Sequence, residues 1–148
     1  ALLHTLYPSV RVSTWVSKWK ASNKTKQEAD TLTQTIQYFS DHGLDKWLAY
    51  IIPVSYVHKF IRLANILALE NCPKSDDITH IQKKIPIESK RDLALNGEDI
   101  VNLFPKRKKG AWIGECLSVI EQEVVKGNIK NNKSALKEWV LCHPLKNN

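Results

Sequence analysis

The sequence predicts an all-α protein, a bundle-like helical body followed by a smaller helical tail. Apolar residues recur at helical spacing in several segments, and no alternating stretch of useful strand length occurs. A chain of 148 residues with 43% hydrophobic and 25% charged residues has the composition of one globular domain or two small ones. We place the body at residues 1–72 and the tail at residues 73–148, with the boundary in a polar stretch.

The charge balance is basic, with 22 Lys and Arg against 15 Asp and Glu and a formal net charge of +7. This excess favours a polyanionic partner. No apolar run approaches the ~20 residues that cross a bilayer, and the start shows no signal peptide, so we expect a cytoplasmic protein without membrane contact. The chain contains no methionine, even at its start, so we expect a piece of a longer protein.

The first predicted helix of the body begins after residue 22. Thr25 and Glu28 can form a capping box, and Asn23 is the alternative cap. Residues 41–43, Asp-His-Gly, end the helix; this order is the reverse of the His-Asp pair of metal phosphohydrolases, and we expect no metal there. Four apolar residues define the buried face of this helix: Ala29, Leu32, Ile36 and Phe39.

Two further helices complete the predicted body. The first runs from Leu44 and stops at Pro53, and the second covers residues 54–69. The second is apolar over much of its circumference, which predicts a central position. Residues 71–80 are polar and interrupted by Pro73, so we expect a linker there. Ile78 and Ile81 are candidates for the start of a short helix, and residues 85–87 are then expected to be extended. The face of the second helix comprises Val57, Phe60, Ile61, Ala64, Leu67 and Ala68.

The tail contains a short helix, a basic turn and a longer helix. Asn96 is the expected N-cap of the short helix, and Pro105 ends it. The longer helix spans residues 111–126, with Gly127 as a left-handed C-cap. A last helix starts near Asn132. The apolar stripe of the longer helix comprises Ile113, Leu117, Ile120 and Val124, and the buried side of the last helix comprises Ala135, Leu136, Trp139 and Val140.

The basic turn is the most distinctive feature of the tail, because four consecutive cations precede the longer helix. Cations beside the free amides of a helix start can cradle a phosphate, although a solvated turn explains the same residues. The neighbouring Trp112 fits either core packing or stacking on a base, and we favour packing. The four cations are Lys106, Arg107, Lys108 and Lys109.

The tail resembles a known family in the order and spacing of several short blocks. The chain contains Asp-Leu at 92–93 and Asn-Gly at 96–97, then Gly110 with Trp112, and finally a Glu-Trp pair at 138–139. These blocks resemble the C-terminal region of bacterial class II CCA-adding tRNA nucleotidyltransferases, and a weaker match covers Trp-Lys at 19–20 in the body. The matching positions also include Asp99, Ile100, Ile113, Leu117, Ile120, Glu121, Val124, Val125, Gly127, Asn131 and Val140, together with Ser22, Asn23 and Lys24.

The resemblance implies a tRNA-binding fragment that grips the acceptor stem and elbow, whereas the catalytic head and neck belong to a longer parent chain. Nucleotide addition requires paired carboxylates that hold metal ions, and the sequence shows no such pair, no glycine-rich phosphate loop and no zinc pattern among Cys72, Cys116 and Cys142. We therefore expect no catalytic residue, metal or cofactor in this fragment, with Mg, CTP and ATP used by the parent. The three cysteines are expected to be buried free thiols.

The expected RNA contacts are to the backbone and the shape of the RNA, since side chains do not read the deep major groove of A-form RNA. The rival interpretation is a free-standing helical module that binds protein or duplex DNA. DNA-binding helix-turn-helix units have turns of about three or four residues. The turn at residues 105–110 is longer, which weighs against DNA binding. The candidate RNA contacts are Lys106, Arg107, Lys108 and Lys109 in the turn, Lys90 and Arg91 before it, and Lys18, Lys20 and Lys24 in the body.

Overall fold

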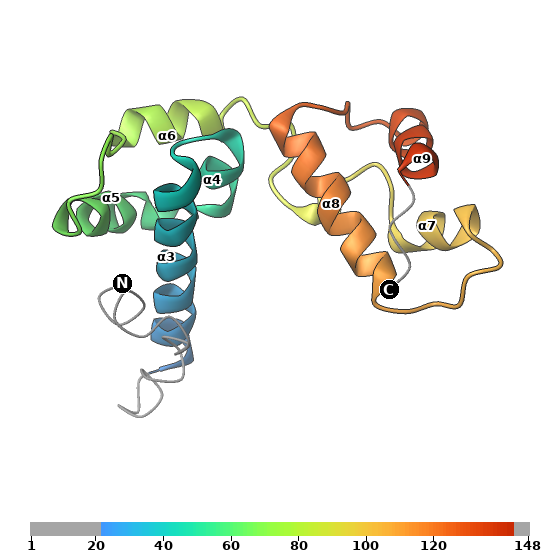
Figure 1. The fold of residues 1–148 in the computed structure, drawn as a ribbon, viewed down its shortest axis with the longest axis horizontal. Coiled ribbons are helices and arrows are strands. Elements are labelled where there is room, and N and C mark those ends of the chain that lie inside the picture. The colour runs from blue at the N-terminus through green and yellow to red at the C-terminus, as the bar shows by residue number, and fades with distance from the viewer. Residues whose placement is uncertain (1–21, 144–148) are drawn as a thin grey trace. The chain divides into compact units, whose positions relative to one another are not determined.

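A computed structural model describes residues 22–143 of the chain, and within this range every regular element is helical. Seven α-helices and two 3-10 helices occur there, and no strand (Figure 1). The all-α prediction is therefore confirmed. The chain packs as two compact units, Ala1–Lys83 and Lys84–Asn148.

The first unit is held together by contacts among four α-helices, both consecutive and distant in the sequence. Helix α5 packs against α3 and α6, and α4 packs against α3 and α6. The core contains an edge-to-face pair in which the rings of Phe39 and Phe60 lie 5.6 Å apart, and it also includes Ile36, Leu48, Ala49, Ile52, Val57, Ala64 and Ile78. The elements are α3 Asn23–His42, α4 Lys46–Ile51, η1 Val54–Tyr56, α5 Val57–Ile66 and α6 Ser75–Gln82.

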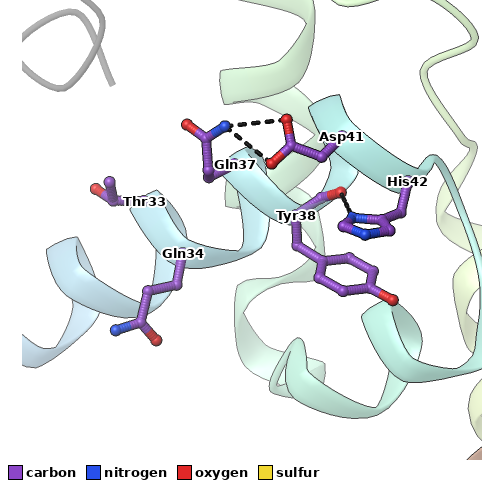
Figure 2. A pocket seen from close by; sticks show the side chains of 6 residues that line it. All are labelled: Thr33, Gln34, Gln37, Tyr38, Asp41 and His42. Carbon is purple, nitrogen blue, oxygen red and sulfur yellow. Dashed lines mark hydrogen bonds between the residues drawn. The ribbon is translucent and has the colours of Figure 1, made fainter. Parts of the chain in front are cut away.

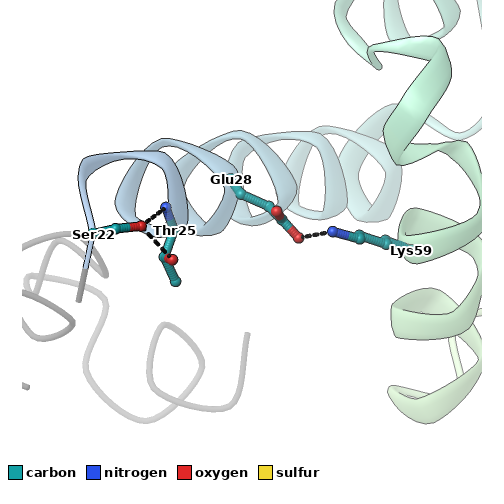
Figure 3. Close-up of polar contacts among 4 residues, drawn as sticks. All are labelled: Ser22, Thr25, Glu28 and Lys59. Carbon is teal, nitrogen blue, oxygen red and sulfur yellow. Dashed lines mark hydrogen bonds and ion pairs between the residues drawn. The ribbon is translucent and has the colours of Figure 1, made fainter.

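The start of α3 is capped by Ser22, whereas the sequence favoured Thr25 or Asn23. The backbone N–H of Thr25 donates to the Ser22 side chain at 3.2 Å, and the Thr25 hydroxyl lies 2.9 Å from the same oxygen (Figure 3). Glu28 is turned elsewhere and pairs with Lys59 of α5 (Figure 3). The predicted Thr25–Glu28 capping box is therefore wrong, because Glu28 joins two helices instead.

Residues 71–80 are not a linker. Pro73 precedes α6, and the Asp77 carboxylate accepts a hydrogen bond from the Lys74 backbone N–H at 3.0 Å, which stabilises the first turn. Ile78 is fully buried, and the Gln82 side chain donates to the carbonyls of Ala49 and Ile52 at 2.9 and 2.8 Å. The first compact unit consequently extends to Lys83, whereas the sequence placed the boundary after residue 72.

The helix predicted over residues 54–69 is shorter than expected. It divides into η1 and α5, and α5 ends at Ile66, since Ala68 and Asn71 both have positive φ, 49° and 53°. Ala68 therefore leaves the predicted buried face, while Phe60 and Ala64 remain fully buried in it. The central position predicted for this helix agrees with its packing against both α3 and α6.

The second unit is arranged around α8, against which α7, α9 and η2 pack. One side of α8 forms the core together with residues from the chain before α7 and from α7 and α9. The core residues are Ile87, Leu93, Leu95, Ile100, Cys116, Ile120, Val124, Val125, Leu136 and Val140. The elements are η2 Lys90–Asp92, α7 Gly97–Leu103, α8 Trp112–Lys126 and α9 Lys133–Cys142.

The helix ends of the second unit follow the sequence predictions. The Asp99 backbone N–H donates to the Asn96 side chain at 2.9 Å, and the Asn96 N–H donates to the Asp99 carboxylate at 3.2 Å, so α7 has a reciprocal cap. Gly127 ends α8 in the left-handed region at φ 86°. Asn132 caps α9 by accepting from the Ala135 N–H at 2.8 Å. The predicted caps at Asn96 and Gly127 are therefore confirmed, and so is the start of the last helix near Asn132.

Long-range polar contacts hold the loop before α7 to the loop before α9. The Asn131 side chain accepts from the Ala94 N–H and donates to the Asp92 carbonyl, both at 2.8 Å. The Asp92 carboxylate in turn accepts from the backbone N–H groups of Ser89 and Glu88 at 2.7 and 3.0 Å. These bonds lower the pKa of Asp92, and the bond from Ser89 contributes most.

The cysteines differ in burial. Cys116 is buried and Cys72 is partly buried, and both are free thiols. Cys142, by contrast, is exposed at the end of α9. The expectation of buried thiols is therefore wrong for Cys142, because the buried side of α9 runs through Leu136 and Val140 instead.

Candidate nucleic-acid interface

The four cations of the basic turn, residues 106–109, lie in the loop between α7 and α8. The side chains of Lys106, Lys108 and Lys109 are exposed. Arg107 is half-buried, and its guanidinium carbon lies 4.3 Å from the centroid of the Trp112 ring. At this distance the cation is attracted to the aromatic face. The turn therefore combines three solvated ammonium groups with one guanidinium that is held in place.

Trp112 organises this turn from the first residue of α8. Its indole N–H donates to the Lys108 carbonyl at 2.8 Å, and its ring meets Phe104 edge to face at 5.9 Å between centroids. The Arg107 backbone N–H donates to the Phe104 carbonyl at 3.0 Å, and this hydrogen bond closes a turn over residues 104–107. The packing interpretation of Trp112 thus agrees with its contacts, although the side chain is only half-buried.

An open hollow of about 530 Å³ adjoins the turn. Leu103, Phe104 and Pro105 supply apolar walls, and Lys106 and Arg107 supply the cations. No side chain caps the start of α8, where Ala111 occupies the N-cap position. The positive end of the helix dipole adds to the field of the four cations, and Glu115 in the first turn of α8 offsets part of it.

The charge of Arg107 also reaches the core beneath the turn. Burial raises the pKa of the Cys116 thiol, and the nearby positive charge of Arg107 opposes that rise. A raised pKa keeps the thiol protonated and unreactive at neutral pH. Cys116 is therefore a protonated thiol buried in the core of the second unit.

Lys90 and Arg91 lie on η2, which packs against α8. The Lys90 ammonium donates to the Ser118 hydroxyl at 2.7 Å and pairs with the nearly buried Glu121 carboxylate at 3.4 Å. Lys90 therefore joins η2 to α8 and has part of its charge compensated. Arg91 is exposed, so it remains the more available cation of this pair.

The remaining sequence candidates lie in the first unit or beyond the described range. Lys24 is exposed in the first turn of α3. Lys18 and Lys20 fall outside the described residues. The structure thus gathers residues 106–109 in one turn and places Arg91 in the same unit, whereas Lys24 belongs to the other unit.

A second hollow, of about 300 Å³, lies along α3 and is lined by amide, hydroxyl and carboxylate groups (Figure 2). Tyr38 stacks on His42 at 4.4 Å between centroids and donates its hydroxyl to Asp45 at 2.8 Å. Burial and this carboxylate raise the pKa of Tyr38 to about 12. Gln37 donates to Asp41 within the same helix (Figure 2). These side chains are therefore engaged with one another.

Within residues 22–143 no three His, Cys, Asp or Glu side chains are grouped closely enough to hold a metal ion. The adjacent Asp76 and Asp77 are exposed in the first turn of α6, where Asp77 caps the helix. No helix in the described part of the chain has the length and apolar character that a membrane crossing demands. What the described surface does offer is a cluster of cations, one of them ordered and three of them solvated.

Comparison with known proteins decides the family. The family profile described as tRNA nucleotidyltransferase domain 2 matches residues 1–140. The chain belongs to this family. The tRNA nucleotidyltransferase domain described here is 34% identical over 143 residues to a CCA-adding enzyme of Oceanobacillus iheyensis, and this match covers 97% of the chain and 36% of the relative.

Other CCA-adding enzymes match in the same way. An enzyme of Anoxybacillus flavithermus is 25% identical over 161 residues, which covers 98% of this domain and 39% of the relative. The crystal structure of the Bacillus stearothermophilus CCA-adding enzyme in complex with CTP shares the fold, with a TM-score of 0.65 and 20% identity over 95% of this domain and 36% of that chain. The domain therefore spans little more than a third of the length of these relatives.

Proposed function

We propose that this chain is the RNA-gripping portion of a CCA-adding tRNA nucleotidyltransferase, and that the basic turn binds the phosphate backbone of tRNA. The observation that carries the proposal is the exposure of Lys106, Lys108 and Lys109 beside an ordered Arg107 at the uncapped start of α8. Clustered cations and free helix amides attract phosphates irrespective of base sequence. An enzyme that adds the same three nucleotides to every tRNA requires such sequence-independent contacts.

The catalytic steps are proposed to belong to the rest of a longer cytoplasmic chain. There, paired carboxylates would hold Mg for the transfer of nucleotides from CTP and ATP. In this proposal residues 22–143 supply RNA binding. In this arrangement the domain holds the acceptor stem and elbow while the tRNA 3′ end reaches the catalytic portion.

The geometry of the turn weighs against the rival, a module that binds duplex DNA through α7 and α8. Residues 104–111 separate the two helices, which is longer than the about three or four residues of a helix-turn-helix. Moreover, α8 starts with Trp112, Ile113 and Gly114, which have no side chains suited to reading base edges in a major groove.

The proposal is tested by filter binding of the 148-residue chain to two tRNAs of unrelated sequence. The triple variant K106Q/K108Q/K109Q removes three cations and leaves Arg107 on Trp112. We expect weaker binding of both tRNAs and a smaller dependence on salt, with the log–log slope reduced by about 0.9 for each phosphate that is no longer neutralised.

The matched control is K74Q/K83Q/K84Q, which removes the same charge from three exposed lysines that are not part of the turn. This control is expected to retain most of the affinity. Equal reductions in affinity in both triple variants would show that only net charge matters, and the basic turn would lose its assigned role. Absence of any tRNA binding by the unmodified chain would contradict the proposed function itself.

A further inference from the structure

The four cations of the basic turn differ in how far they are ordered before any ligand arrives. Lys106, Lys108 and Lys109 are exposed, and within the described part of the chain their side chains take part in no ion pair, hydrogen bond or ring contact. Arg107 instead lies over Trp112 at 4.3 Å. Its position is thus fixed by an aromatic side chain that is itself anchored.

Trp112 is anchored by two independent contacts. The indole N–H is bonded to the Lys108 carbonyl at 2.8 Å, and the ring is packed against Phe104 with an interplanar angle of 83°. These contacts set both the tilt and the depth of the indole in the turn. The Arg107 guanidinium therefore rests on a platform with little freedom to rotate.

Ordering a side chain before binding lowers the entropy cost of binding. A guanidinium that stacks through its face keeps its in-plane N–H groups for a phosphate, to which it can donate two parallel bonds. An unrestrained lysine supplies charge to the same field but must give up its rotamer freedom to make a fixed contact. Arg107 and the three lysines are consequently expected to contribute in different ways.

We propose that Trp112 is a positioning residue for RNA binding, which holds Arg107 as the pre-ordered phosphate contact of the basic turn. This inference rests on the proposed function. The alternative, a base stacked directly on Trp112, conflicts with the contacts, because Arg107 already covers the indole and the indole N–H is bonded to the chain.

Two single variants and their combination test the inference through tRNA affinity measured over a range of salt concentrations. Arg107→Lys keeps the charge and loses the planar group, and Trp112→Leu keeps an apolar side chain and loses the platform. Each is expected to weaken binding by roughly two- to twelvefold, the factor equivalent to ordering one long side chain. The salt slope should remain unchanged, since no cation is removed.

The combination R107K/W112L is expected to bind as weakly as either single variant and no weaker, because Trp112 acts through Arg107. The matched control, Lys108→Gln, is expected to show the opposite signature, a reduced salt slope. Additive effects in the combination would overturn the inference, since they would mean that Trp112 touches the RNA directly. Unchanged affinity in Arg107→Lys would overturn it as well, while tRNA binding by the unmodified chain would leave the proposed function standing.

A measurement on the free protein separates positioning from a general loss of structure. ¹⁵N relaxation of the Arg107 Nε–H group should show an ordered side chain in the unmodified protein and a mobile one in Trp112→Leu. Trp112→Phe, which retains a ring, should give intermediate order and a smaller reduction in affinity, and it tests the same prediction if Trp112→Leu fails to fold. A mobile Arg107 in the unmodified protein would contradict the inference.

Discussion

The two units of this domain are stabilised in different ways. Both units have an apolar core, which in the first unit includes Phe60, Leu48 and Ile52, and the long-range side chain–backbone bonds of the first unit run from Gln82 to the end of α4. The second unit adds a set of side chain–backbone contacts in which Asn96, Asp92 and Asn131 fix the loops around α8. Apolar volume can be supplied by several residue types, whereas a cap or a loop contact requires a particular one.

This difference explains where the sequence carries recognisable family blocks. The blocks of the second unit include Asp92, Asn96, Asp99, Gly127 and Asn131, and the structure gives each a defined structural role. They are therefore part of the framework that presents the basic turn. The blocks contain no residue of the turn at 106–109, although the turn holds the cations that we propose to bind RNA.

The largest expected effect lies in the apolar core of the first unit. Phe60→Ala removes a fully buried ring that packs on Phe39, and we expect a decrease of about 3–5 kcal/mol in the free energy of unfolding. Phe60→Leu, which keeps most of the apolar volume, should cost much less. Urea denaturation of both variants measures the difference. An equal cost for the two would contradict the view that volume, and not residue identity, stabilises this unit.

The corresponding substitution in the second unit is Asn131→Ala. It removes two hydrogen bonds that join two loops, and at about 0.5–1.5 kcal/mol for each bond we expect a decrease in stability of about 1–3 kcal/mol. Asn128→Ala removes only an exposed hydrogen bond to Glu123 and should change stability by less than about 0.5 kcal/mol. Thermal unfolding monitored by circular dichroism would compare them, and similar melting temperatures would remove the assigned role of Asn131.

Two glycines of α8 and its C-cap give effects of opposite sign. Gly127→Ala places a side chain in the left-handed region at φ 86° and should destabilise by about 1–2 kcal/mol. Gly114→Ala meets no atom within 4 Å and lies within the helix, where alanine should stabilise by about 0.5–1 kcal/mol. The same denaturation experiment checks both signs, and a stabilising Gly127→Ala would contradict the left-handed cap.

The smallest effect concerns acid stability of the second unit. Two contacts lower the pKa of Asp99 below its ordinary 3.8. The ion pair with Lys133 at 2.7 Å contributes most, and the hydrogen bond from the Asn96 N–H contributes next. Because the pKa is lower in the folded state, the stabilisation is present above pH 3.8 and disappears as the pH falls through the lowered value. Asp99→Asn should therefore reduce stability at neutral pH and flatten its decline below pH 3.8. A decline as steep as that of the unmodified protein would show that Asp99 does not contribute.

The sequence predicted the helices where local signals agreed with the tertiary packing. Asn96, Pro105 and Gly127 each determine a backbone feature at their own position, so the boundaries of α7 and α8 could be foreseen. The sequence indicated α6 only through Ile78 and Ile81 as the start of a short helix, and it placed the domain boundary in the same stretch, because the polar composition hid the acidic first turn. Its stability depends on Gln82 reaching Ala49, a hydrogen bond across 33 residues that no local pattern reveals.

The sequence predicted the positive charge of the candidate site but not which of its cations are held in place by other residues. Four consecutive cations are visible in the sequence, but the stacking of Arg107 on Trp112 depends on the path of the turn. The ion pair of Lys90 with Glu121 likewise joins residues far apart in the sequence, so its compensated charge could not be foreseen. Sequence reasoning treated these cations as equivalent, whereas the structure distinguishes them by their contacts.

The most direct test of the central claim is a salt titration of tRNA binding by the unmodified 148-residue chain. Affinities for two tRNAs of unrelated sequence and for a duplex DNA of similar length would be measured at several salt concentrations. If about four cations meet phosphates, both tRNAs should bind alike, more tightly than the DNA, with a log–log slope on the order of −3. Tighter binding to the DNA, or affinity for tRNA that does not change with salt, would contradict the account.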